Sequence, residues 1–287
     1  MTPNPEDTYA LGYTAEEHCR LERQAALLAP CTERLFRAAG ISPGNRVLDV
    51  GSGIGDVSLL LSEIVGPGGE VVGVERDPKS VARAKAKVEA ASLKNISFRE
   101  SDIAGVNSAG TFDAIVGRFI LMYLPDPAKT LRSLAKRLRP GGVMAFLEPS
   151  WAAAHGLSAH LQLYSDCATA IVDTFKACGV NPEMGTAMLM AFQDAGLPAP
   201  NMNMEIMLGA DEEFTGAPAQ ILRSLEPQAS RNGVSLAKLG DLGTLGERLR
   251  AEIEASGSPI AWLAGHVGAW CRLPANSSTA APVPPFG

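Results

Sequence analysis

The stretch that decides the fold is Val47-Leu-Asp-Val-Gly-Ser-Gly-Ile-Gly-Asp56, where an apolar run leads directly into three closely spaced glycines. The apolar half has the composition of a buried strand, and residues 54–65 have the spacing of a helix. Gly51, Gly53 and Gly55 would let the backbone approach a ligand closely, and the following helix N-terminus would attract an anion. A glycine-rich turn alone is also compatible with a purely structural role.

Short apolar runs and longer helical patterns alternate on both sides of this stretch. The predicted strands of this central region cover residues 46–50, 70–74, 96–100, 112–117 and 143–148. The predicted helices cover residues 54–65, 78–91 and 127–139. Asp77 and Asp126 are expected to cap the second and third helix, and Pro140-Gly-Gly142 to end the third. Helices between strands imply right-handed crossovers, so we predict an α/β fold, a doubly wound and mostly parallel sheet.

Two regions flank this core. Residues 8–39 are predicted to be helical, interrupted at Pro30 and closed by Gly40. Further helices are predicted around residues 157–178, 184–195 and 218–255, with strands over 201–208 and 259–273. The expected organisation is a helical lid at 1–40, a core at 41–150, helical insertions plus final strands at 151–273, and a disordered tail at 274–287.

Composition narrows the classes of function. The 287 residues include 25 Lys and Arg against 31 Asp and Glu, a net charge of −6, which argues against a non-specific nucleic-acid binder. The five cysteines form no C-x-x-C pair, so neither a disulfide framework nor a zinc site is expected. No apolar stretch approaches the ~20 residues of a membrane span, and the first residues lack the pattern of a signal peptide. We therefore expect a soluble, cytoplasmic protein.

Two acidic residues follow strands on the same side of the predicted sheet. Glu75 ends the second strand, where a carboxylate in this fold can accept hydrogen bonds from both hydroxyls of a ribose. Asp102 follows the third strand and could accept from an exocyclic adenine amine. Each alone could be a solvated loop residue, but together with the glycine turn they favour a nucleoside site. The nicotinamide fingerprint needs a glycine where this chain has Asp56, which argues against a dehydrogenase.

At this point the sequence resembles the class I S-adenosylmethionine-dependent methyltransferases. The resemblance covers residues 41–149 and rests on the glycine stretch, Glu75, Ser101-Asp102-Ile103, Phe112-Asp-Ala-Ile-Val-Gly-Arg118 and Leu138-Arg-Pro-Gly-Gly-Val143. It is strongest to small-molecule methyltransferases of the ubiquinone, menaquinone and natural-product type. It implies a seven-stranded Rossmann-like sheet, S-adenosylmethionine as cofactor and S-adenosylhomocysteine as product.

The resemblance also implies roles for individual residues. It implies a cofactor site made of Tyr9, Gln24, Gly51, Ser52, Gly53, Glu75, Arg76, Asp102, Ile103 and Arg118. Tyr9 and Gln24 would close over the amino-acid end, as in a similar lid element of some relatives. Tyr13, Met122 and Trp151 would contact the acceptor. For Arg118, a strand-end arginine paired with a helix carboxylate is the alternative interpretation.

The sequence gives less information about the methyl acceptor than about the cofactor. His155 and Glu148 are candidate general bases, with a surface or core histidine and a loop carboxylate as the alternatives. Methionines that could line an apolar cavity are Met184, Met188, Met190, Met202, Met204 and Met207. We expect methyl transfer to a small, largely apolar metabolite by a monomer or homodimer without a metal. A protein or RNA methyltransferase and a non-catalytic cofactor-binding module remain alternatives.

Overall fold

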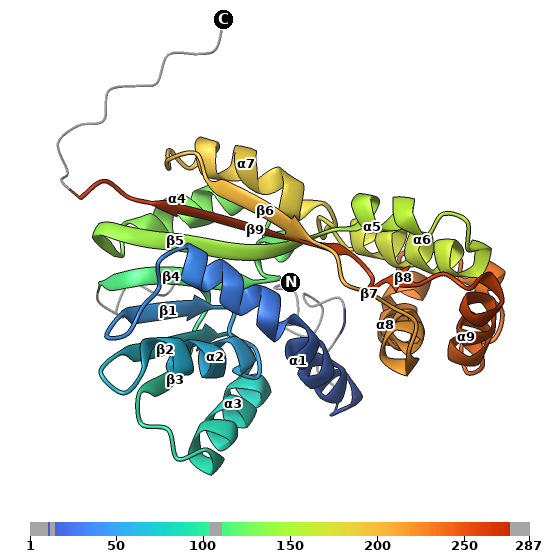
Figure 1. Cartoon of the computed structure of the whole chain (residues 1–287), viewed down its shortest axis with the longest axis horizontal. Coiled ribbons are helices and arrows are strands. Elements are labelled where there is room, and N and C mark those ends of the chain that lie inside the picture. Colours follow the sequence, from blue (N-terminus) through green and yellow to red (C-terminus); the bar gives the residue numbers. More distant parts are fainter. Residues whose placement is uncertain (1–10, 12–14, 104–110, 276–287) are drawn as a thin grey trace, which may run out of the picture.

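The computed structural model describes Leu11, residues 15–103 and residues 111–275. Its centre is a seven-stranded sheet with the order β3-β2-β1-β4-β5-β9-β6 (Figure 1). The strands are β1 (Arg46–Val50), β2 (Glu70–Glu75), β3 (Ile96–Glu100), β4 (Phe112–Arg118), β5 (Leu138–Ser150), β6 (Asn201–Glu205) and β9 (Gly265–Arg272). The first five are parallel, and β9 is antiparallel to both β5 and β6. The predicted fold class is confirmed.

Helices cover both faces of this sheet. The helices that pack on or beside it are α1 (Ala15–Ala38), α2 (Asp56–Val65), α3 (Pro78–Ala90), α4 (Pro127–Ala135) and α7 (Met184–Asp194). Helix α1 packs against α2, helix α7 packs against α4, and both α1 and α7 contact β5 and β9. Figure 1 shows these two pairs of helices on opposite sides of the sheet. Asp77 and Asp126 accept hydrogen bonds from the first turns of α3 and α4, so both predicted N-caps are confirmed.

The remaining helices gather beyond the carboxyl ends of the parallel strands, at one side of Figure 1. They are α5 (Trp151–Leu157), α6 (Gln162–Ala177), α8 (Glu212–Arg231) and α9 (Leu245–Ser256), with the short 3₁₀ helices η3 (Leu121–Tyr123) and η4 (Ala237–Leu239). Helix α8 packs against α6 and α9. A two-stranded sheet of β7 (Leu208–Gly209) and β8 (Ile260–Ala261) lies beside them. This arrangement puts a second layer of structure over the edge of the sheet where ligands bind in such folds.

Several predicted boundaries were wrong. The predicted strand over 201–208 is divided into β6 and β7, and the predicted helix over 218–255 into α8, η4 and α9. Helix α1 continues through Pro30, because Leu28, Leu35 and Phe36 on its apolar face are fully buried and this packing outweighs the lost hydrogen bond. Helix α4 ends at Ala135, and β5 begins before the Pro-Gly-Gly turn because Leu138 already pairs with Phe112. The predicted final strand, 259–273, is broken between β8 and β9, where Leu263 has a positive φ of 59°.

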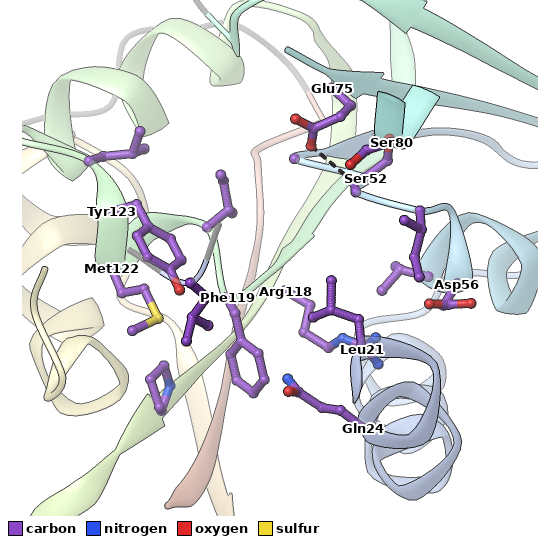
Figure 2. A pocket seen from close by; sticks show the side chains of 18 of the residues that line it. Leu21, Gln24, Ser52, Asp56, Glu75, Ser80, Arg118, Phe119, Met122 and Tyr123 are labelled. Carbon is purple, nitrogen blue, oxygen red and sulfur yellow. Dashed lines mark hydrogen bonds between the residues drawn. The ribbon is translucent and has the colours of Figure 1, made fainter. Parts of the chain in front are cut away.

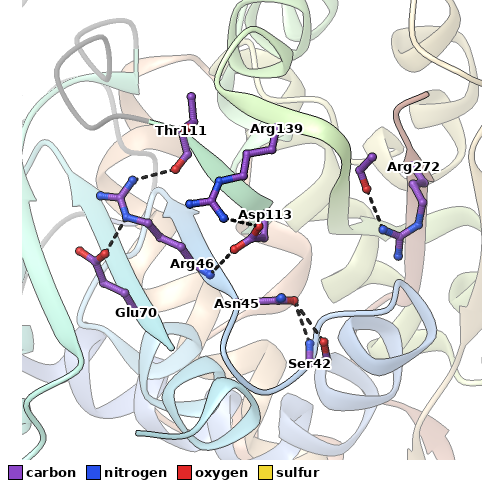
Figure 3. A network of polar contacts seen from close by, with 9 residues as sticks. Ser42, Asn45, Arg46, Glu70, Thr111, Asp113, Arg139 and Arg272 are labelled. Atoms are coloured by element: carbon purple, nitrogen blue, oxygen red, sulfur yellow. Dashed lines mark hydrogen bonds and ion pairs between the residues drawn. The ribbon is translucent and has the colours of Figure 1, made fainter. Parts of the chain in front are cut away.

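A polar network lies at the amino ends of the parallel strands (Figure 3). Asp113 accepts from the backbone N–H of Arg46 at 2.7 Å and from the Arg139 guanidinium at 2.7 Å. Arg46 also donates to Glu70 at 2.6 Å and to the carbonyl oxygen of Thr111 at 2.8 Å. These contacts join β1, β2, β4 and β5 and hold their register. They lie at the end of the strands opposite to the carboxyl ends, where a ligand would bind.

Candidate functional site

An open cavity of about 240 Å³ lies at the carboxyl ends of β1, β2 and β4. Helix α1, helix α8 and the segment between β8 and β9 complete its walls. Figure 2 shows Glu75 and Ser52 on one side, Phe119, Met122 and Tyr123 on the other, and Arg118 between them. The cavity thus has one polar side formed by strand ends and one apolar side formed by the segment after β4 together with the helical insertions.

The glycine turn forms part of the polar side. Gly51, Gly53 and Gly55 have φ values of 66°, 52° and 88°, in the left-handed region that favours glycine. The backbone N–H groups of Gly51 and Ser52 donate to the Val74 carbonyl oxygen at 2.9 and 3.0 Å, which ties the turn to β2. A Cβ atom added to Gly53 would meet no atom within 4 Å. The hydrogen bonds to β2 therefore fix the turn, and the space at Gly53 is open towards the cavity.

Glu75 is held firmly at the end of β2. One carboxylate oxygen accepts from the backbone N–H of Gly53 at 3.0 Å, and the other accepts from the N–H groups of Arg76 and Asp77 at 2.8 and 2.9 Å. These contacts fix the carboxylate beside the glycine turn, and Oε2, which accepts only one of them, keeps a lone pair for a further donor. Ser52 places a buried Oγ atom beside this turn, and that atom has no hydrogen-bond partner in the described part of the chain.

Arg118 brings a positive charge to the cavity from the end of β4. Its guanidinium donates to Thr32 Oγ1 at 3.3 Å, and within the described residues no carboxylate forms an ion pair with it. Burial lowers the pKa of Arg118, while Asp56 and Asp49 act on it from a longer distance. In the described part of the chain, Arg118 thus forms no ion pair with a helix carboxylate, which was the alternative interpretation. An anionic ligand group would offset the cost of this buried charge.

Helix α1 closes the cavity through a buried polar cluster. Arg20 donates to Glu17 at 2.6 Å and to Gln24 Oε1 at 2.6 Å. Ser224 in α8 donates to the same Glu17 carboxylate at 3.0 Å, which joins α1 to the helical insertions. Gln24 lines the cavity, and its contact with a cofactor stays a prediction, whereas Tyr9 and Tyr13 lie outside the described residues.

The structure brings together most of the residues singled out from the sequence. Cavity-lining residues among them are Gln24, Gly51, Ser52, Gly53, Glu75, Arg76, Asp102, Ile103, Arg118, Met122 and Trp151. None of the six methionines proposed for an apolar cavity lines it. Met184 and Met188 are buried in the core, while Met190 and Met204 are exposed, so the hypothesis of a methionine-lined cavity is wrong.

Neither proposed general base borders the cavity. Glu148 is fully buried, and its carboxylate accepts from the backbone N–H groups of Ile120, Leu121 and Met122 at 2.9, 2.8 and 3.3 Å. Burial raises the pKa of Glu148 to about 7, although these three donors oppose the shift. His155 Nε2 lies 2.6 Å from Ser165 Oγ, which joins α5 to α6. In this arrangement Glu148 positions η3 and His155 holds two helices together.

Sequence reasoning missed the aromatic wall of the cavity. Phe119, Phe175, Trp262 and His266 all line it, although they come from three segments that are distant in sequence. The break after β8 turns Trp262 and the beginning of β9 towards the cavity. The sequence predicted a continuous strand over 259–273. A uniform strand gives no reason to single out His266, so this residue was not predicted to line the cavity.

Comparison with known proteins gives the family of this chain. The family profile described as a methyltransferase domain matches residues 41–194. The chain belongs to this family of methyltransferase domains. The resemblance inferred from the five motifs is thereby confirmed.

Individual relatives match only part of the chain. An arsenite methyltransferase of Halobacterium salinarum is 30% identical over 136 residues, which are 47% of this chain and 34% of that protein. A demethylmenaquinone methyltransferase of Staphylococcus aureus is 32% identical over 119 residues, 41% of this chain and 48% of that protein. The matches thus span about a third to a half of these relatives.

The fold as a whole also has solved counterparts. A putative sarcosine dimethylglycine methyltransferase from Galdieria sulphuraria superposes with a TM-score of 0.52 over 87% of this chain and 86% of that chain, at 15% identity. At this identity the likeness concerns the fold alone. No helix in the described part of the chain is long and apolar enough to cross a bilayer.

Proposed function

We propose that this protein uses S-adenosylmethionine to methylate a small, largely apolar organic acceptor. The observation that carries the proposal is that one cavity contains both the glycine turn with Glu75 and the aromatic wall. The first side suits a nucleoside, and the second suits an apolar molecule. A methyl donor and its acceptor must share one such space, because the reacting atoms have to meet at roughly 3 Å.

The residues present fit the proposed cofactor. Glu75 is positioned to accept from ribose hydroxyls, and Asp102 and Ile103 line the same cavity where the adenine edge would lie. The open surface over Gly53 leaves room for the methionine portion, and the unpaired Arg118 charge suits a carboxylate. The cofactor supplies a methyl group already activated by a positively charged sulfur. The protein then has to align the acceptor and exclude water, which the aromatic wall and α1 are placed to do.

Three observations favour an organic acceptor over the other candidates. None of the five cysteines lines the cavity, so no thiolate is available there to hold a thiophilic acceptor such as arsenite. The net charge of −6 gives no electrostatic support for nucleic acid. One of the relatives is named for demethylmenaquinone, an organic acceptor, which supports the same conclusion.

The test is methyl transfer from S-adenosylmethionine carrying a labelled methyl group to an extract of the host, followed by separation of the products by size. We expect label in the small-molecule fraction. Label confined to protein or RNA would overturn the acceptor class.

A second experiment tests the cofactor position by calorimetry with S-adenosylhomocysteine. Glu75→Ala should raise Kd about tenfold or more, and Glu75→Gln by less, because Gln retains an acceptor oxygen. Undiminished affinity of Glu75→Ala would contradict the assigned cofactor position.

A further inference from the structure

The imidazole of His266 lies in the aromatic wall against two other rings. Its centroid is 5.8 Å from that of Phe119 and 5.9 Å from that of Trp262, and all three residues line the cavity. They come from different strands: Phe119 follows β4, Trp262 follows β8, and His266 belongs to β9. The fold therefore brings Phe119 to Trp262 and His266, which lie close to each other in sequence but far from Phe119.

The backbone is strained where it positions these rings. Phe119 has a φ of 53° and Leu263, the residue after Trp262, has a φ of 59°. Both are bulky residues in the left-handed region, which costs about 1 to 3 kcal/mol at each position. Such strain concentrates at binding sites, where surrounding contacts hold a residue in place for its function. Both strained residues also line the cavity.

Two polar atoms of this wall have no partner. Within the described residues, neither Nδ1 of His266 nor Nε1 of Trp262 makes a hydrogen bond, although both atoms are buried. A buried polar atom left unpaired is costly, and native proteins leave few of them. Because both rings border the cavity, a ligand bound there could provide the missing partner.

The chemistry of the two side chains limits what that ligand can be. Burial and the nearby charge of Arg118 lower the pKa of His266 to about 4, so the imidazole is neutral near pH 7. A neutral imidazole has one nitrogen that donates and one that accepts, while the indole of Trp262 only donates. A hydroxyl group, which donates and accepts, satisfies this pair. An ammonium group does not, because Arg118 would repel it and the indole offers no acceptor.

The remaining residues of the wall favour a ligand whose hydroxyl group is attached to a flat, apolar ring. Trp151 and Phe175 meet edge to face, with centroids 6.2 Å apart, and both line the cavity together with Met122 and Ile221. Aromatic walls favour aromatic ligands through offset or edge-to-face contacts. We propose that His266 and Trp262 form a hydroxyl-binding subsite and that the acceptors of this protein are hydroxylated aromatic compounds, that is, phenols. This inference rests on the proposed function, since it names the acceptor class of the same cavity.

The test compares phenols with their methyl ethers on the full chain saturated with S-adenosylhomocysteine. Calorimetry measures binding of phenol, 4-methylphenol and 2-naphthol, each beside its methyl ether, which cannot donate a hydrogen bond. We expect at least one phenol to bind about 10-fold or more tightly than its ether. In His266→Phe this ratio should fall to about 1, and His266→Asn, which retains an acceptor, should keep part of it. His160→Phe, the same substitution at an exposed position outside the cavity wall, should leave the ratio unchanged.

Three outcomes would decide against this subsite. Equal affinity for every phenol and its ether would overturn it, as would failure of all three phenols to bind. An unchanged ratio in a His266→Phe protein that still binds S-adenosylhomocysteine would overturn it as well, because that binding shows an intact fold. Failure of the wild-type protein to bind S-adenosylhomocysteine at all would instead overturn the proposed function, so the two failures are distinguishable.

Discussion

At the scale of single residues, glycines in one turn are required for different reasons. A Cβ atom at Gly51 would lie 2.6 Å from Cδ1 of Ile120, so a larger residue there collides with the protein itself. At Gly53 a Cβ atom would meet nothing within 4 Å, and the residue borders the cavity. Both glycines border the cavity, but a Cβ atom at Gly51 is opposed by Ile120, whereas the space over Gly53 is open to a ligand.

This difference predicts that two matched substitutions differ in their main effect, Gly53→Ala on ligand binding and Gly51→Ala on stability. Gly53→Ala should weaken S-adenosylhomocysteine binding about tenfold while lowering the free energy of unfolding by only about 1 kcal/mol, the cost of an alanine at positive φ. Gly51→Ala should lower the free energy of unfolding by about 2 to 3 kcal/mol, since it adds an overpacked contact to the same backbone strain. Calorimetry and urea unfolding measure the two quantities. Normal binding by a folded Gly53→Ala protein would show that the turn is only structural.

At the scale of elements, Glu148 links β5 to η3. Its carboxylate at the end of β5 satisfies three consecutive backbone N–H groups, those of residues 120–122, that would otherwise be buried without partners. This contact places Met122 at the cavity wall. A residue that was expected to act on the acceptor directly thus acts through the backbone that it positions.

The environment of Glu148 predicts a pH dependence of stability. Its pKa is about 7 in the folded protein, against 4.5 for an ordinary glutamate, so between these values the folded state binds more protons than the unfolded state. The contribution of Glu148 to stability therefore increases as the pH falls from about 7 to about 4.5 and is constant below that. Urea unfolding at pH 7.5, 6 and 5 should show wild type gaining stability relative to Glu148→Gln across this window. A difference that does not change with pH would contradict the raised pKa.

At the scale of the whole molecule, the cavity connects the sheet to the helical insertions. The turn after β1, helix α1, helix α8 and the segment before β9 all border it, and the Glu17–Ser224 hydrogen bond joins α1 to α8. A ligand in this position contacts the sheet, α1 and the helical insertions at the same time. Binding is therefore expected to stabilise the protein as a unit.

Cofactor binding should accordingly raise the unfolding temperature. At 100 times Kd, S-adenosylhomocysteine should add about 2.7 kcal/mol to the free energy of unfolding. For a chain of this size that corresponds to a rise in Tm of roughly 5 °C. Scanning fluorimetry measures the shift, and Glu75→Ala at the same ligand concentration should show a smaller one. An unchanged Tm of the wild type in the presence of saturating ligand would count against specific binding in the folded state.

The sequence alone determined the sheet, the glycine turn and the polar side of the cavity, because these depend on local patterns. Apolar runs specify strands, Asp77 and Asp126 cap helices, and Glu75 and Asp102 reach one edge because parallel strands end together. Only the tertiary structure decided the apolar side, since Phe119 and His266 meet through a positive φ and a break in a strand that no local pattern indicates. It also decided the role of Glu148, because a carboxylate placed among backbone N–H groups stabilises a turn, whereas the same residue facing a cavity could act as a base. Burial and orientation, which depend on residues distant in sequence, make that difference.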